Sequence, residues 1–136
     1  MKKYLLLILC VLTLAVTSCK KEVIAPETSN RTILFDILAA DWKTTDGGYT
    51  YFRDIVVPEN TKNFNDSGQI IVAMSFEDLN VYEGLPQVFN GLSYRYTTDP
   101  GFVTIILTDP NGGLISHAPT FDATAKITLI DSQIID

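Results

Sequence analysis

The 136-residue chain is poor in cysteine, with only Cys10 and Cys19, and both lie within its first nineteen residues. The rest of the chain contains no thiol. This excludes a disulfide, a cysteine-ligated metal and a cysteine nucleophile there. Histidine is scarcer still, since His117 is the only one. A Ser-His-Asp triad would have to use this one residue.

Positive charge is also scarce. The sequence has 10 Lys and Arg residues against 16 Asp and Glu residues, and its formal net charge at pH 7 is −6. Lys2 and Lys3 belong to the leader described below, so the rest of the chain is more acidic still. A negatively charged surface repels the phosphate backbone, and we therefore expect no nucleic-acid partner.

The chain has no apolar run long enough for a permanent transmembrane helix. Residues 4–16 are apolar except for Thr13. Thirteen residues at a rise of 1.5 Å each cover about 20 Å, whereas the hydrocarbon core of a bilayer is roughly 30 Å thick. With Lys2 and Lys3 in front of this run, the pattern predicts that residues 1–18 are a signal peptide.

The leader ends in Val16-Thr17-Ser18-Cys19, where a small residue stands directly before a cysteine. This arrangement resembles the lipobox of bacterial lipoproteins. The resemblance implies that the chain is cut before Cys19, and that Cys19 then carries acyl chains such as palmitate. Each buried methylene contributes about 0.8 kcal/mol, so two or more chains anchor a protein stably in a membrane. A plain secretory signal with an incidental cysteine is the alternative.

Residues 19–30 are predicted to be the lipidated Cys19 followed by a flexible linker, about 17 Å in average span. Lys20-Lys21-Glu22 partly resembles the surface-export signal of Bacteroidetes lipoproteins, in which acidic residues follow a lysine. A solvated tether is the alternative interpretation. The aspartate that retains other lipoproteins in the inner membrane is absent, because Lys20 takes its position. We expect the cell outer membrane, with the choice between the periplasmic and the surface side left open.

Residues 31–136 are predicted to form one all-β domain, because β-branched and aromatic residues are dense and turn clusters recur at short spacing. Seven antiparallel strands predict a β-sandwich. An immunoglobulin-like arrangement is one form of it, and a small β-barrel is the alternative architecture. The strands are expected at residues 32–40, 49–57, 69–76, 85–89, 92–97, 102–108 and 123–130.

Three local patterns add detail to this prediction. Residues 69–76 are apolar on both faces, which is typical of a central strand. Asn90-Gly91 supplies the positive φ angles of a two-residue hairpin turn. Residues 60–64 are expected to make a helical turn that Gly68 closes. The remaining residues between the strands are expected to form loops.

Several segments together resemble a group of small Bacteroidetes lipoproteins that have a lipobox signal and a single β-sandwich domain. They are the aromatic strand of residues 51–58 ending in Val-Pro, residues 68–72, Leu85-Pro86 and the final strand of residues 124–130. The resemblance covers most of residues 42–130. It implies the fold and the cellular localisation of the protein. It does not imply an activity.

The clearest candidates for ligand binding are aromatic residues. If they share one exposed sheet face, their rings offer a platform on which the apolar face of a pyranose can stack. Rings in this alternation also pack between sheets or across strands, where each pair contributes about 0.2–1 kcal/mol. Exposure of the tryptophan with at least two coplanar tyrosines would favour the platform. The candidates are Trp42, Tyr49, Tyr51, Tyr94 and Tyr96.

Catalytic and metal-binding patterns are weak. Side chains of adjacent residues on an extended chain point apart, so Ser116 and His117 are not expected to form a dyad. The segment from Asp109 to Gly113 has too few oxygen ligands for calcium and is predicted to be a plain turn. The acidic residues Glu77, Asp78 and Glu83 are predicted to lie in a solvated loop.

These observations predict a non-catalytic binding or structural module, with no cofactor and no metal site. We expect the membrane to be one partner, through the lipid on Cys19, and another envelope protein or a glycan to be the other. A carbohydrate-binding accessory domain that uses the aromatic platform is the alternative function.

Replacing Cys19 with alanine is expected to abolish lipidation, because the acyl chains join to its sulfur in this interpretation. Metabolic labelling with a radioactive fatty acid should mark the wild-type chain and leave the Cys19→Ala variant unlabelled. Unchanged labelling of the variant would remove the assignment of this site.

Overall fold

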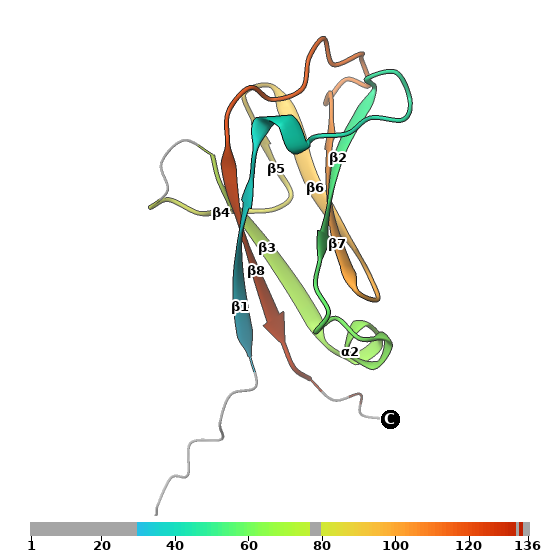
Figure 1. Ribbon diagram of the computed structural model, residues 1–136, viewed down its shortest axis with the longest axis vertical. Helices are drawn as coiled ribbons and strands as arrows, with labels where there is room; N and C mark the ends of the chain where they lie inside the picture. Colours follow the sequence, from blue (N-terminus) through green and yellow to red (C-terminus); the bar gives the residue numbers. More distant parts are fainter. Residues whose placement is uncertain (1–29, 77–79, 133, 135–136) are drawn as a thin grey trace, which may run out of the picture.

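The computed structural model describes residues 30–76, 80–132 and 134, and every structural statement below refers to these residues (Figure 1). No helix within them is long and apolar enough to cross a membrane. The elements in chain order are β1 (Arg31–Ile37), η1 (Ala39–Asp41), β2 (Thr50–Val56), α2 (Lys62–Ser67), β3 (Gln69–Ser75), β4 (Glu83–Gly84), β5 (Gln87–Phe89), β6 (Leu92–Asp99), β7 (Phe102–Thr108) and β8 (Ala123–Ile130).

The strands form two four-stranded sheets that lie face to face (Figure 1). The strand order is β1-β8-β3-β4 in one sheet and β2-β7-β6-β5 in the other, and all neighbours are antiparallel. The predicted β-sandwich is confirmed, and the described strands do not close into a barrel. The connectivity is not that of an immunoglobulin domain, whose first two strands share a sheet. Here β1 and β2 lie in different sheets.

The core is the layer of apolar side chains between the two sheets. Every second residue of the long strands points into this layer, as the period of two requires. Complete burial of one aliphatic side chain contributes about 1.5–3 kcal/mol to the stability of the fold. The described domain has no covalent cross-link that would add to this stability. The fully buried aliphatic residues on strands include Ile37, Ile55, Val72, Met74, Val103, Ile105, Leu107 and Ile127.

One open side of the sandwich, between β1 and β2, is closed by Arg53. The side chain of Arg53 lies on the same face of β2 as the buried Ile55 and therefore points between the sheets. Its guanidinium carbon lies 5.4 Å from the centre of the Phe35 ring on β1, and one of its nitrogens lies 3.6 Å from Asp41 Oδ2. The ring and the carboxylate explain how a charged group is tolerated at the margin of the core.

Two segments differ from the predicted pattern of strands and loops. The strand expected at residues 32–40 ends at Ile37, because the chain turns into η1. The backbone N–H of Leu38 donates to Asp41 Oδ2 at 3.2 Å, and the N–H of Asp41 donates to the Leu38 carbonyl at 2.9 Å. The segment before Leu85, expected to be a loop, contributes the two-residue strand β4.

The prediction that residues 69–76 form a central strand holds for only part of β3. Strand β8 pairs with the whole of β3, whereas β4 pairs only with Ala73 and Met74. The edge of β3 around Ile70 is therefore not covered by a strand. Ile71, on the outer face of the sheet, is 46% exposed. The apolar run thus reflects a buried inner face and a half-exposed outer one.

Two predicted turns are confirmed. Asn90 and Gly91 have φ angles of 47° and 75° and join β5 to β6 in a hairpin. The helical turn forms as α2, starting at Lys62 instead of residue 60. Thr61 caps α2 by accepting a hydrogen bond from the Phe64 N–H, and the Gly68 N–H closes it on the Phe64 carbonyl.

Asn60 is a buried polar residue that ties α2 to the turn between β6 and β7. Its side chain is fully buried. Nδ2 donates to the carbonyls of Asp99 at 2.7 Å and Phe102 at 3.3 Å. The Asn60 carbonyl accepts from the Gly101 N–H at 2.7 Å. Asn60 therefore holds this turn against the start of α2 through three hydrogen bonds.

The Asn60→Ala variant is expected to lower the free energy of unfolding by about 1–3 kcal/mol, because the hydrogen bonds of a buried amide to two backbone carbonyls are lost. Urea denaturation of the wild type and the variant measures this difference. Asn63→Ala is the control, since Asn63 is an exposed residue of α2 and should change stability by less than about 0.5 kcal/mol. Equal effects of the two substitutions would contradict the role of Asn60.

Candidate binding cleft

Two of the five predicted platform residues lie in the core. Trp42 is 8% exposed and Tyr94 is completely buried. Their rings meet edge to face with centroids 6.4 Å apart, and the ring of Phe76 lies 4.9 Å from that of Tyr94. These residues stabilise the fold and are not accessible to a ligand.

The other three candidates do not form a common exposed surface. Tyr49 is 55% exposed, just before β2, while Tyr51 and Tyr96 are half-buried against the core. The structure therefore does not bring the five aromatic residues together as a platform. The physical reason is that Tyr51, Tyr94 and Tyr96 occupy the inner face of their strands, which the opposite sheet covers.

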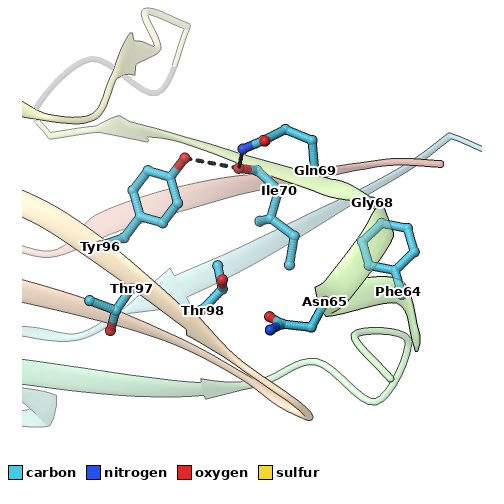
Figure 2. Close-up of a pocket in the computed structure, with 8 residues that line it drawn as sticks. All are labelled: Phe64, Asn65, Gly68, Gln69, Ile70, Tyr96, Thr97 and Thr98. Atoms are coloured by element: carbon cyan, nitrogen blue, oxygen red, sulfur yellow. Dashed lines mark hydrogen bonds between the residues drawn. The ribbon is translucent and has the colours of Figure 1, made fainter. Parts of the chain in front are cut away.

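Tyr96 instead forms part of a cleft on the open side of the sandwich where β3 lacks a full-length neighbour (Figure 2). The Tyr96 hydroxyl donates to the Ile70 carbonyl at 2.9 Å and so bridges β6 and β3. Gln69 Nε2 donates to the same carbonyl at 3.0 Å. The edge of β3 is thus satisfied by side chains. The cleft has a volume of about 370 Å³, and its lining residues are Phe64, Asn65, Gly68, Gln69, Ile70, Tyr96, Thr97 and Thr98.

Helix α2 forms the end wall of this cleft. The Phe64 ring packs so closely on Gly68 that a Cβ atom there would lie 2.7 Å from the ring. A larger residue at position 68 would therefore displace the Phe64 ring. Asn65 Oδ1 accepts from the buried Asn60 Nδ2 at 3.3 Å, which orients the Asn65 amide. Figure 2 shows Asn65 pointing towards β6.

The cleft is polar and uncharged. None of its eight lining residues carries a carboxylate, an ammonium, a guanidinium or an imidazole. Amide groups come from Asn65 and Gln69, hydroxyl groups from the threonines and Tyr96, and ring surface from Phe64 and Tyr96. Small-molecule sites commonly combine a concave shape of roughly 300–1,000 Å³ with a few converging polar groups. The cleft lies within that range of size.

A second pocket, of about 220 Å³, contains two carboxylates whose oxygens are already used by the fold. It is lined in part by Asp36, Asp122 and Thr124. Asp122 Oδ1 accepts from the Ala39 N–H at 2.8 Å, and Asp36 Oδ1 accepts from Thr124 Oγ1 at 3.0 Å. These bonds hold the end of β1 against β8. We interpret this pocket as structural.

The expectation that Ser116 and His117 point apart is wrong. Ser116 Oγ lies 2.9 Å from His117 Nδ1. The two residues belong to an irregular loop instead of an extended strand, so the period of two does not apply. Both are exposed, and they line a pocket of about 210 Å³ together with Asp109. Asp109 Oδ1 accepts from the Asn111 N–H at 2.7 Å, which is the plain turn expected there.

The acidic residue Asp46 has a perturbed pKa for a structural reason. The pKa of Asp46 is lowered to about 2, chiefly because its carboxylate accepts the backbone N–H of Thr50. That bond measures 2.9 Å, and Thr44 Oγ1 donates to the same oxygen at 2.9 Å. Asp46 thus organises the loop that leads into β2. This loop lies at the opposite end of the sandwich from α2 (Figure 1).

Most cleft residues were not identifiable from the sequence. Of the predicted platform residues only Tyr96 lies there. Asn65, Gln69 and Thr98 carry no motif. The one available signal is the break in hydrophobic alternation at Gln69 and Thr98, and it does not show that these residues meet.

Comparisons with known proteins identify no family for this chain. No protein-family model, no curated protein and no solved structure matches it. In the described ranges no group of three or more His, Cys, Asp or Glu side chains is placed to hold a metal ion. The predicted lipidation residue Cys19 lies outside the described residues, as do Glu77 and Asp78.

The burial of Tyr94 generates a prediction for alkaline pH. Burial disfavours the phenolate and raises the pKa of Tyr94 to about 12, whereas an unfolded tyrosine titrates near roughly 10. This preference for the neutral phenol stabilises the fold fully below about pH 10, and the contribution is lost as the pH rises towards about 12.

The Tyr94→Phe variant should therefore lose less stability than the wild type over that pH window. Urea unfolding at a series of pH values measures the loss. Tyr49→Phe, at a residue that is 55% exposed, should behave like the wild type. A Tyr94→Phe variant with the same pH dependence as Tyr49→Phe would contradict the burial of Tyr94.

Proposed function

We propose that this protein is a lipid-anchored lipoprotein of the bacterial outer membrane, and that its β-sandwich is a non-catalytic binding module. The observation that carries the binding role is the uncharged cleft between α2, β3 and β6. It is concave, and the groups that line it accept or donate hydrogen bonds.

The lipid anchor is supported by the order of features along the sequence. A charged start, a short apolar run and Cys19 precede a polar linker, and β1 begins soon afterwards, at Arg31. The linker spans about 17 Å on average, which is enough to hold the domain just clear of the lipid headgroups. The acyl chains on Cys19 would make the membrane the first partner of this protein.

A binding role is favoured over catalysis by the chemistry of the cleft. General acid-base catalysis needs a group whose pKa lies near the working pH, most often histidine or a carboxylate. The lining of the cleft offers amides and hydroxyl groups instead. Ser116 and His117 lie in a different, shallower pocket and are exposed to water. We propose another envelope protein or a glycan as the second partner.

Envelope fractionation tests the proposed anchor. The wild-type chain should sediment with outer membranes, and the Cys19→Ser variant should move to the soluble periplasmic fraction because it lacks the acyl chains. Cys10→Ala is the matched control: it removes the other cysteine and should stay with the membranes. Digestion of intact cells with added protease then distinguishes a surface-exposed domain from a periplasmic one. A Cys19→Ser chain that still sediments with membranes would refute the anchor.

A further inference from the structure

We infer that the cleft between α2, β3 and β6 binds one neutral, hydroxyl-rich unit, and that its ligand is a sugar residue without charge. This inference rests on the proposed binding role and adds the class of ligand. It depends on three properties of the cleft: the absence of charge, the hydrogen-bonding groups that remain available, and the size.

The absence of charge selects a neutral ligand. The domain has an excess of acidic residues, yet none of the residues that line the cleft is ionised. The nearest charges on α2, Lys62 and Asp66, are exposed and pair with each other at 2.6 Å. An ionic ligand would lose hydration in this cleft without meeting an opposite charge, which costs free energy. A neutral ligand avoids that cost.

The available hydrogen-bonding groups suit hydroxyl groups, which donate and accept. Tyr96 Oη and Gln69 Nε2 are both committed to the Ile70 carbonyl, and Asn65 Oδ1 accepts from Asn60. Within the described part of the chain, Asn65 Nδ2 remains as a donor and Gln69 Oε1 as an acceptor. The hydroxyl groups of Thr97 and Thr98 remain as both. A ligand with neighbouring hydroxyl groups can satisfy such a mixed set.

The size of the cleft is sufficient for a single sugar ring. Its volume of about 370 Å³ lies within the range of roughly 300–1,000 Å³ that is usual for small-molecule sites. The lining also includes the rings of Phe64 and Tyr96. Aromatic rings offer apolar surface against which the C–H face of a pyranose can pack.

The position of the cleft leaves two sources for such a sugar. The start of β1, which the linker precedes, and α2 lie at the same end of the sandwich (Figure 1). Ser132, which follows β8, donates to the Ser67 carbonyl of α2, and the Asp131 N–H donates to Asn30 Oδ1. The cleft therefore lies at the anchored end. The sugar is either part of a free glycan or the headgroup of a neutral glycolipid.

The test uses the full-length lipidated chain in a detergent that has no sugar headgroup. Binding is measured by saturation-transfer NMR and calorimetry with free glucose, galactose, mannose, fucose and N-acetylglucosamine, and with glucuronate as the charged counterpart of glucose. Lipid vesicles with and without a neutral glycosylated lipid test the second source. We expect saturable binding of at least one neutral sugar or of the glycolipid vesicles, and at least roughly tenfold weaker binding of glucuronate.

Two pairs of variants locate the site. Thr98 lies on the same face of β6 as Tyr96 (Figure 2). Thr98→Val removes one hydroxyl at nearly constant shape and should weaken binding by roughly threefold to tenfold. Thr120→Val is its control, because Thr120 is exposed and does not line the cleft. Asn65→Asp keeps the oxygen that accepts from Asn60 but loses the donor and adds a charge. It should weaken binding by more than roughly tenfold, with Asn63→Asp on the same helix as its control.

Each outcome decides the inference. Loss of binding in Thr98→Val and Asn65→Asp, with both controls unchanged, supports it, whichever source supplied the sugar. Binding that is equal in all four variants places the sugar elsewhere and overturns the assignment of the cleft. Tighter binding of glucuronate, or no binding of any sugar or vesicle, overturns the ligand class. In that case normal fractionation of the wild type and release of Cys19→Ser would still support the lipid anchor.

Discussion

The apolar layer between the two sheets is the constraint on which the other features of the domain depend. No thiol is available after Cys19 to cross-link the chain, so stability has to come from burial. Strands β3, β7 and β8 therefore give every second position to aliphatic residues, and Tyr94 and Trp42 are buried in the same layer. Rings that serve in this way cannot also serve as an exposed ligand surface.

The two open sides of the sandwich are closed by different means. Between β1 and β2, Arg53 covers the core with the help of Phe35 and Asp41. On the other side β4 is too short to cover β3, and the carbonyl of Ile70 is satisfied by side chains. A concave, polar surface results there because a strand edge must be hydrogen-bonded even where no strand pairs with it. The cleft is a consequence of this incomplete closure.

The fold was largely predictable because antiparallel strands and their turns produce clear local patterns in the sequence. The apolar run of residues 69–76 and the alternation in residues 123–130 identified both strands, and Asn90-Gly91 identified a hairpin through its positive φ angles. The binding residues were much less predictable. Tyr94 and Tyr96 alternate with polar neighbours, a pattern that is typical both of a core face and of an exposed platform. Only the position of the opposite sheet distinguishes the two.

What could be read from the order of residues is therefore local: the strand positions, their two faces, the hairpin turn and a leader whose cysteine resembles a lipoprotein signal. The pairing of β1 with β8 and of β2 with β7 was decided by tertiary packing, as was the meeting of Asn65, Gln69 and Thr98 around one cleft. The physical reason is the distance along the sequence over which each effect acts. Backbone geometry acts over a few residues, whereas the choice of strand partners depends on how the whole chain buries its apolar surface.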